Sequence, residues 1–254
     1  MLLSAVIITL NEAPNIARCI ESLRGVADEV IVLDSFSKDD TAALAAGMGA
    51  RVFQQKFTGY GEQKLAAIEK ATHDWILSID ADEALDPTLR ESIAAIKENP
   101  RCDAYAFNRL TNYCGKWIRH CGWYPERMLR LINRQKGSMT ADKVHEGFRM
   151  KAGATVGLLK GDLLHYSFPT ISAHLKKIEQ YSEMGARFDV ARGRRVSLLK
   201  LWLGPKWVFF QTYFLKAGFL DGYYGYIICK NSAFAAFAKY AKIRQYAGEG
   251  LADN

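Results

Sequence analysis

The stretch that decides the fold is Asp74-Trp75-Ile76-Leu77-Ser78-Ile79-Asp80-Ala81-Asp82-Glu83, in which a short apolar run ends abruptly in three acids. A short apolar run with β-branched residues is typical of a buried strand, and parallel strands covered on both faces have this composition. The acids therefore come directly at the carboxyl end of a strand. In open α/β sheets, ligands bind at that edge.

Asp80 and Asp82 predict a metal site at this edge. Two carboxylates one residue apart are costly to bring together without a cation. Mg²⁺ and Mn²⁺ prefer oxygen ligands and carry substrate phosphates with them, so either ion would relieve the repulsion. The alternative is a solvated strand-to-helix turn in which Asp86-Pro87 caps the next helix.

The flanking sequence predicts an α/β fold. Strand and helix patterns alternate from Ser4 to Ile96, which is typical of a doubly wound, mostly parallel sheet with helices on both faces. The expected strands cover residues 4–10, 28–34, 51–54 and 74–79, and the expected helices cover residues 16–23, 41–48 and the later part of 59–72.

A further acid, Asp34, ends the strand expected at residues 28–34. There it could accept a hydrogen bond from a nucleoside, as acids at this strand end do in dinucleotide-binding folds. No GxGxxG motif follows the first strand, so a dinucleotide cofactor is not expected. The alternative for Asp34 is that it caps the loop that follows.

Three segments in matching order and spacing resemble family 2 glycosyltransferases with the GT-A fold: residues 6–16, 30–41 and 80–83. Later segments resemble the bacterial lipopolysaccharide core β-glucosyltransferases of the WaaE/KdtX type: residues 122–125, 127–131, 144–146 and 165–167. The resemblance extends through nearly the whole chain and is least distinctive in the C-terminal part. It implies a GT-A (Rossmann-like) domain that transfers a sugar from a nucleotide-sugar donor.

In that family, residues after the first two strands hold the uracil and ribose, and the middle acidic motif binds the metal on the diphosphate. The resemblance therefore implies Asp82 as the nearest metal ligand and Asp80 as a contact to the ribose or a metal-bound water. Lys64 is a candidate donor contact, with a solvated helix lysine as the alternative. The residues implied to surround the nucleoside are Thr9, Asn11, Glu12 and Asp34.

Residues 115–124 combine aromatic and basic side chains, which suits a sugar-phosphate acceptor. Guanidinium groups pair with phosphate, and aromatic rings stack on sugar faces. The alternative is a packed loop with ordinary aromatic anchors. Arg127 and Arg130 would face opposite ways on a strand and the same way on a helical turn, and either could help to neutralise a leaving diphosphate. The candidate acceptor contacts within the loop are Trp117, Arg119, Trp123 and Tyr124.

An inverting transfer needs a base that takes the proton from the acceptor hydroxyl as it attacks the anomeric carbon. The resemblance places this base at Glu146, with Asp142 in reserve. His145 is either an acceptor contact or a structural histidine. The resemblance also makes His165 a candidate ligand of the metal or the diphosphate, against the alternative of a structural histidine at a strand end.

The 254-residue chain has a net charge of +7, all of it in the C-terminal part. Residues 187–254 contain eleven Lys and Arg against four Asp and Glu, whereas the preceding residues hold equal numbers of each sign. A neutral body with a basic tail indicates an anionic partner surface, either a membrane or a nucleic acid. Five cysteines without CxxC spacing indicate reduced thiols in a cytosolic protein.

Residues 171–254 predict a helical appendage. Residues 198–220 mix large apolar side chains with lysines, which suits the headgroup region of a membrane, and residues 234–246 predict another basic, aromatic helix. The alternative is a lid or a dimer surface that buries these rings. Neither a signal peptide nor a transmembrane helix is expected. The helix expected at residues 171–190 would turn Leu175, Ile178, Tyr181 and Phe188 inward and Lys176 and Lys177 outward.

We therefore expect a GT-A domain at residues 1–170, with a donor-binding half at 1–100 and an acceptor half at 101–170, and a membrane-associating tail at 171–254. The expected reaction is a metal-dependent transfer of a hexose, glucose from UDP-glucose by resemblance, to an inner-core heptose of lipopolysaccharide. It would form a β linkage on the cytoplasmic face of a bacterial inner membrane.

Three alternatives to this reading remain. The nearest is the same fold acting on another polysaccharide or on a polyprenyl phosphate. A nucleotidyltransferase is disfavoured because the loop at residues 11–15 is neither glycine-rich nor basic. A nucleic-acid binder is disfavoured because the body of the chain is neutral and acids cluster at its strand ends, so no nucleic acid is expected as a partner.

Overall fold

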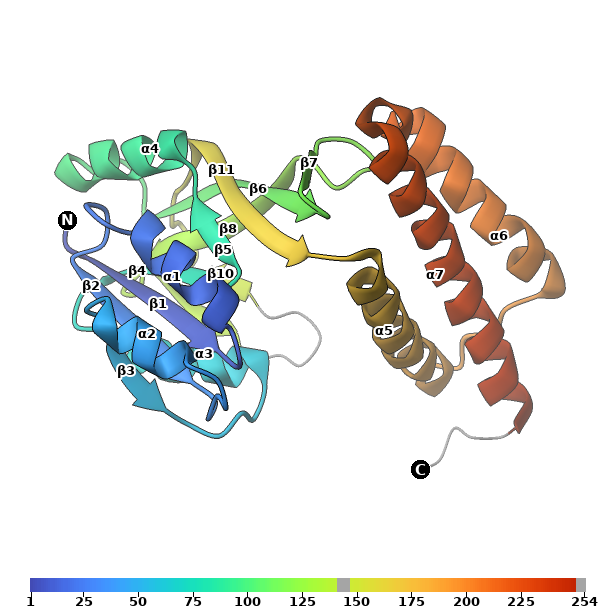
Figure 1. Ribbon diagram of the computed structural model, residues 1–254, viewed down its shortest axis with the longest axis horizontal. Helices are drawn as coiled ribbons and strands as arrows, with labels where there is room; N and C mark the ends of the chain where they lie inside the picture. Colours follow the sequence, from blue (N-terminus) through green and yellow to red (C-terminus); the bar gives the residue numbers. More distant parts are fainter. Residues whose placement is uncertain (141–146, 250–254) are drawn as a thin grey trace. The chain divides into compact units, whose positions relative to one another are not determined.

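The computed structural model describes residues 1–140 and 147–249 and divides the chain into two compact units (Figure 1). The first, which we call the sheet unit, comprises residues 1–110 and 126–165. The second, which we call the helical unit, comprises residues 111–125 and the chain from residue 166 onward.

The first half of the sheet is parallel. Its strands lie in the order β3 (Arg51–Gln54), β2 (Glu29–Asp34), β1 (Leu3–Thr9) and β4 (Trp75–Asp80). Thr9 pairs in register with Asp34, and Ile8 pairs with Asp80, so the acids that end β2 and β4 lie at one edge of the sheet. The predicted strands and their order along the chain are confirmed, with ends that differ by at most one residue.

Helices cover both faces of this half, as predicted. One apolar core joins α1 (Ala13–Ser22), α2 (Thr41–Gly47) and α4 (Pro87–Glu98) to one face of the strands. A second core packs α3 (Tyr60–Glu69) on the other face through Ala67. Both cores are built from fully buried strand residues, which is why these strands lack polar alternation.

The second half makes the sheet mixed. β8 (Glu126–Asn133) runs antiparallel to both β4 and β6 (Ala104–Tyr113), and β5 (Glu83–Leu85) runs antiparallel to β11 (Val156–Phe168). The short β7 (Lys116–Ile118) pairs with β6, and β9 (Gly137–Thr140) pairs with β10 (Gly147–Met150). The return of β11 places His165 opposite Glu83.

The short strand β5 differs from the expected open loop after Asp80. Glu83 begins it and is fully buried, because its carboxylate accepts the backbone N–H of Asp80 and lies beside Arg130. Asp86 then caps α4 and accepts a hydrogen bond of 2.6 Å from the backbone N–H of Leu89. The alternative for this stretch was a solvated turn with Asp86 as the helix cap. The cap is present, but Glu83 is buried, so the turn is not fully solvated.

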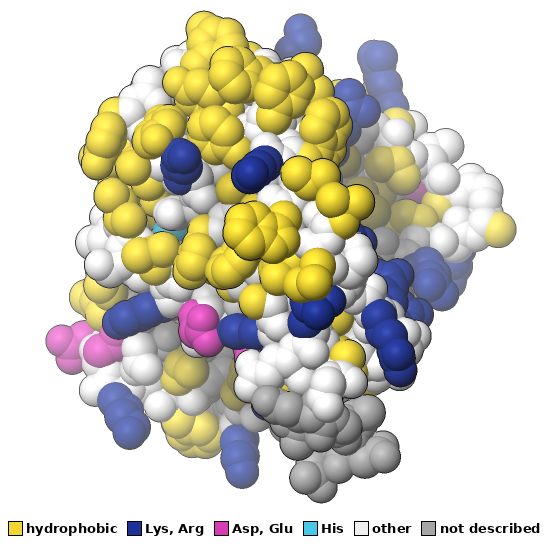
Figure 2. Space-filling view, turned by 90° about the vertical axis from the view of Figure 1, so that its right-hand side faces the viewer, with side chains coloured by type: hydrophobic (Ala, Val, Ile, Leu, Met, Phe, Trp, Pro, Cys, Tyr) yellow, Lys and Arg dark blue, Asp and Glu magenta, His cyan; other side chains and the backbone are white. Residues whose placement is uncertain are grey.

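The helical unit consists of α5 (Ile171–Ala191), α6 (Leu198–Phe210), a π turn η1 (Gln211–Leu215), a 3₁₀ turn η2 (Gly218–Asp221) and α7 (Gly222–Glu249). Its core joins Tyr113 and Ile118 to Ile228 and Cys229 of α7. Figure 2 shows that apolar side chains also gather on its outer surface. In the described ranges 1–140 and 147–249, no helix is long and apolar enough to cross a membrane.

The prediction of which face of α5 is buried is wrong. Of the four side chains predicted to point inward, only Ile178 is buried, whereas Tyr181 is 65% exposed. Polar residues line the buried face instead, because each has a partner there: His174 lies 3.1 Å from the Tyr113 hydroxyl, and Asp189 pairs with Lys239 at 2.7 Å. The remaining predicted inward residues, Leu175 and Phe188, are 41% and 40% exposed.

Candidate active site

Asp34 organises the edge where β1 and β2 end. Its side chain is fully buried and accepts hydrogen bonds from the Thr9 hydroxyl (3.0 Å) and from the backbone N–H of Ser37 (2.9 Å). The carboxylate therefore links the last residue of β1 to the loop after β2. The bond from the Ser37 N–H is the loop cap that was the alternative role for Asp34.

The loop after β1 is joined to the same segment. The backbone N–H of Asn11 donates to the Ser37 hydroxyl at 2.8 Å, and the Asn11 side-chain carbonyl accepts from the Lys38 N–H at 2.8 Å. Asn11 adopts φ +55°, a left-handed conformation that asparagine tolerates better than most residues. Glu12 accepts from the Asn15 amide at 2.8 Å. The four predicted nucleoside contacts thus lie at the ends of β1 and β2 and in the loop after β1, which hydrogen bonds link to the loop after β2.

Asp80 lies between two cations. One carboxylate oxygen is 2.8 Å from Lys64 Nζ, and the other is 2.8 Å from an Arg130 nitrogen. Burial raises the pKa of Asp80, but Arg130 and Lys64 outweigh it and hold this pKa well below the ordinary value. Asp80 is therefore an anion in the folded protein. Lys64 is only 11% exposed, so it is not the solvated helix lysine considered as the alternative.

Glu83 and Arg130 form the buried centre of the network. Glu83 is fully buried, and its carboxylate lies 3.2 Å from Arg130 and 3.6 Å from Arg109. Burial raises the pKa of Glu83 above its usual range even though Arg130 opposes this shift. Burial by itself lowers the pKa of Arg130, but Asp80 and Glu83 raise it, so the guanidinium stays charged. Arg130 is thus committed to two carboxylates within the protein.

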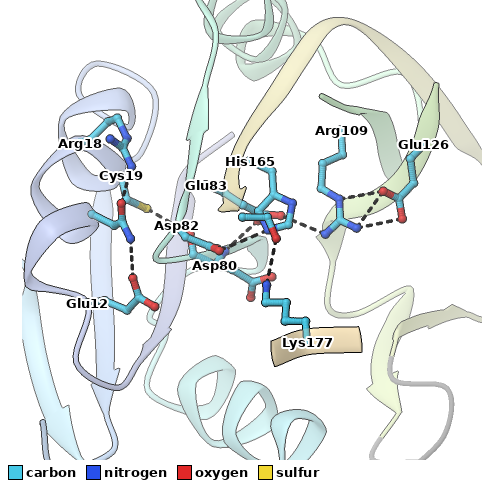
Figure 3. Close-up of polar contacts among 12 residues, drawn as sticks. Glu12, Arg18, Cys19, Asp80, Asp82, Glu83, Arg109, Glu126, His165 and Lys177 are labelled. Carbon is cyan, nitrogen blue, oxygen red and sulfur yellow. Dashed lines mark hydrogen bonds and ion pairs between the residues drawn. The ribbon is translucent and has the colours of Figure 1, made fainter. Parts of the chain in front are cut away.

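The network continues to the surface through Arg109, which donates to both carboxylate oxygens of Glu126 at 2.8–2.9 Å. Figure 3 shows Glu83 and Asp80 on one side of Arg109 and Glu126 on the other. Side chains of opposite charge from α3 and from strands β4, β5, β6 and β8 therefore form one connected network. This arrangement holds the end of β4 in one geometry.

Asp82 and His165 face each other beside this network (Figure 3). Asp82 Oδ2 lies 3.3 Å from His165 Nε2, and the two side chains are 25% and 14% exposed. His165 Nδ1 is buried and has no hydrogen-bond partner among the described residues. Without a metal, the imidazole can donate its Nε2–H to Asp82. If Nε2 coordinated a metal, the proton of the neutral ring would be on Nδ1 instead.

This pair fits a divalent metal with two protein ligands. A carboxylate suits Mg²⁺ or Mn²⁺, and substrate phosphates usually complete the coordination of these ions, while histidine is the commonest metal-binding side chain for divalent metals in general. Within the part of the chain that the structure describes, no group of three or more His, Cys, Asp and Glu side chains could hold a metal. Substrate phosphates or water would supply further ligands to an ion held by these two side chains.

The residues predicted to contact the acceptor fall into different settings. In the helical unit, the ring of Trp117 lies 5.2 Å from that of Tyr166, and the Arg119 guanidinium lies 5.2 Å over the Tyr124 ring. Trp123 packs against Tyr113, so it is an aromatic anchor of the core.

In the sheet unit, Arg127 and Arg130 lie on strand β8. Arg127 is exposed and Arg130 is buried, so they face opposite ways, as expected for residues three apart on a strand. Asp142, His145 and Glu146, which carry the predicted base and its neighbours, lie outside the described residues.

Three residues at this edge were not singled out from the sequence: Ser37, Glu83 and Arg109. Glu83 belongs to the acidic motif, but the sequence assigns it no role. Its position opposite His165 follows only from the pairing of β5 with β11. Arg109 occurs in an alternating strand pattern, where a charged residue is normally taken to face water. Only the pairing of β6 with β8 places it beside Glu126.

Comparison with known proteins identifies the family. The sequence profile described as Glycosyl transferase family 2 matches residues 4–163, more than half of the chain. An uncharacterised glycosyltransferase of Rickettsia felis is 35% identical over 257 residues, which cover 96% of this chain and 89% of that protein. The lipopolysaccharide core biosynthesis glycosyltransferase LpsC of Rhizobium meliloti is 35% identical over 254 residues, covering 96% of this chain and 92% of LpsC.

Among solved structures, glucosyl-3-phosphoglycerate synthase of Mycobacterium tuberculosis, determined with Mn²⁺, UDP and glucosyl-3-phosphoglycerate, shares 27% sequence identity. The match covers 44% of each chain with a TM-score of 0.37. An overlap this limited bears on neither the ligands nor the acceptor of the present protein.

Proposed function

Because this chain belongs to glycosyltransferase family 2, we propose that it transfers a hexose from a UDP-sugar to a sugar of the lipopolysaccharide inner core. UDP-glucose is the proposed donor and a heptose is the proposed acceptor, with inversion to a β linkage. The name of LpsC, which is similar over nearly the whole chain, supports a lipopolysaccharide core acceptor. The observation that carries the proposal is the Asp82–His165 pair beside the ion-paired Asp80.

We propose that the donor binds along the edge formed by β1, β2 and β4. The nucleoside would contact the ends of β1 and β2 and the loop after β1, through Thr9, Asn11, Glu12 and Asp34. Lys64 and Arg130 hold the Asp80 carboxylate between them, so that one acid is fixed as an anion near the proposed ribose position. Asp82 and His165 remain partly exposed and would face the diphosphate.

Asp82 and His165 would hold Mg²⁺ or Mn²⁺ together with the diphosphate oxygens. A divalent ion bound there would stabilise the negative charge of the departing nucleoside diphosphate. Arg127 is exposed on β8 and is a further candidate for that charge. Arg130 is already paired with Asp80 and Glu83, so we propose for it a positioning role toward Asp80.

Glu146 is the proposed base, with Asp142 in reserve. It would take the proton of the acceptor hydroxyl while that oxygen attacks the anomeric carbon and the bond to the diphosphate breaks. Trp117, Arg119, Tyr124 and His145 are proposed acceptor contacts, whereas the packing of Trp123 favours a supporting role for it.

We propose two functional parts, a GT-A domain at residues 1–170 and a membrane-associating tail at 171–254. The family match, which covers residues 4–163, supports the first of these. A lipid-linked acceptor would place the enzyme on the cytoplasmic face of a bacterial inner membrane, where the basic tail meets anionic lipid.

The proposal is tested by the melting temperature with UDP and a panel of UDP-hexoses, each with and without Mn²⁺. A ligand that binds only the folded state raises this temperature by mass action. We expect metal-dependent stabilisation by UDP, which Asp82→Asn removes. Asp74→Asn, at the opposite end of β4, is the control and should respond like the parent protein. A parent protein that responds to no nucleotide, with metal or without it, would overturn the proposal.

A further inference from the structure

Helix α6 is mostly apolar, yet α7 and the rest of the protein cover it only in part. None of its thirteen residues, all of which are described, is buried. Leu199 and Trp202 are each 69% exposed, and Trp207 is 57% exposed. A helix that is apolar all round normally lies inside a protein core or in a membrane.

The apolar surface continues beyond α6 into the turns and α7. Figure 2 shows these side chains gathered on one face, with Lys and Arg among them and around them. Soluble monomers rarely expose contiguous apolar patches larger than a few hundred Å² without an interaction to explain them. The exposed members after α6 are Phe214, Leu215, Phe219, Leu220, Tyr223, Tyr226, Phe234 and Phe237.

The charges on this part of the chain have one sign. Between residues 190 and 248, the sequence contains a single carboxylate, Asp221. It is buried (4% exposed), and it accepts the backbone N–H of His120 at 2.8 Å. Exposed lysines are distributed over the same elements, at positions 200, 206, 216 and 230. Within residues 190–248, the exposed charges that accompany the apolar face are therefore positive.

A groove of about 350 Å³ lies between α6 and α7 within this face. Its walls are carbon-rich, and Lys206 is the one charged residue among those that line it. An ammonium group beside an apolar groove matches the chemistry of a phospholipid, whose acyl chain adjoins an anionic headgroup. The remaining lining residues are Leu201, Trp202, Pro205, Ala233, Phe234 and Phe237.

We propose that this face docks on an anionic phospholipid bilayer, with α6 lying in the headgroup region and the α6–α7 groove receiving one acyl chain. A second copy of the chain is a poorer occupant, because it would bring two faces of the same positive sign together. Trp and Tyr side chains favour the membrane–water interface, and lysines at this depth extend to the anionic headgroups. The inference rests on the proposed membrane setting and is independent of the sugar-transfer chemistry.

The first test is flotation of the full-length protein with vesicles of phosphatidylcholine alone or with added phosphatidylglycerol. We expect binding to the anionic vesicles that weakens as salt is added. Lys200→Ala and Lys206→Ala should each weaken binding about fivefold at low salt. The double variant Leu199→Glu/Leu215→Glu should abolish binding. Leu44→Glu, which changes an exposed leucine of α2, is the matched control and should bind like the parent protein.

The groove is tested with vesicles whose acyl chains carry bromine, which quenches tryptophan fluorescence on contact. Quenching should fall strongly in Trp202→Phe, since Trp202 lines the groove. A parent protein that shows no binding to anionic vesicles but is stabilised by UDP would overturn this inference and leave the transferase proposal standing. Concentration-dependent dimerisation that Leu199→Glu/Leu215→Glu removes would assign the face to a second copy instead.

Discussion

Replacing Arg130 by methionine should destabilise the sheet unit more than a typical core substitution does. The guanidinium lies 2.8 Å from Asp80 and 3.2 Å from Glu83, and its side chain is only 7% exposed. Methionine fills similar volume but leaves both carboxylates without this partner. Removing one member of a buried ion pair typically costs about 3–5 kcal/mol, because the remaining charge has lost both its partner and its water.

The structure indicates how this cost divides between the two acids. Asp80 keeps Lys64 at 2.8 Å and is 28% exposed, so water and a cation still compensate it. Glu83 is 0% exposed and keeps the backbone N–H of Asp80 and one cation, Arg109, at the longer distance of 3.6 Å. Most of the penalty should therefore fall on Glu83, and the double variant Arg130→Met/Glu83→Gln should recover about half of the 3–5 kcal/mol loss.

The assay is urea unfolding monitored by circular dichroism at pH 7.5, for the parent, the single variants and the double variant. Arg127→Met is the matched control, because it lies on the same strand with an exposed side chain and should change the free energy of unfolding very little. A loss below about 1 kcal/mol in Arg130→Met, or no recovery in the double variant, would refute the assignment of this network as the support of Asp80.

Three further predictions concern catalysis and pH. Asp82→Ala should abolish UDP release from a UDP-hexose in the presence of acceptor, by removing a metal ligand; activity near the parent level would exclude Asp82 from that role. Glu146→Gln should keep UDP-dependent stabilisation but lose transfer, and undiminished transfer would move the base to Asp142. Burial lowers the pKa of His174 to about 4, so the folded protein holds it neutral where an unfolded chain would take up a proton. This contribution to stability is fully present above about pH 6.5 and is lost as the pH falls toward 4. Urea unfolding between pH 7 and pH 4.5 should therefore show a steeper loss of stability in the parent than in His174→Asn, and equal slopes would contradict the reasoning.

The parallel half of the fold could be predicted because each of its strands carries its own signal. Trp75–Asp80 is apolar along its length and ends at an acid, and the parallel direction of β1, β2 and β4 follows from the alternation of strands and helices. The family resemblance, now confirmed by the match to residues 4–163, added the activity class.

The antiparallel half and the helical unit were harder to predict for a physical reason. The place of Arg109 and Glu83 depends on pairings between strands far apart in sequence, and no local pattern specifies them. On α5, hydrophobic periodicity pointed to Tyr181 and Phe188, whereas the buried face is set by polar side chains that find partners, such as His174 and Asp189. Periodicity cannot register a buried polar residue whose partner lies elsewhere in the chain.

The hydrogen bonds of Asp34 and Asn11 have a consequence for the speed of donor binding. Both loops at this edge are already fixed, through Thr9, Ser37 and Lys38, before any nucleotide arrives. A site that is ordered in advance does not lose loop entropy when its ligand binds. Nucleotide association here should therefore be a single, fast bimolecular step, with its rate proportional to nucleotide concentration and without a plateau from loop ordering.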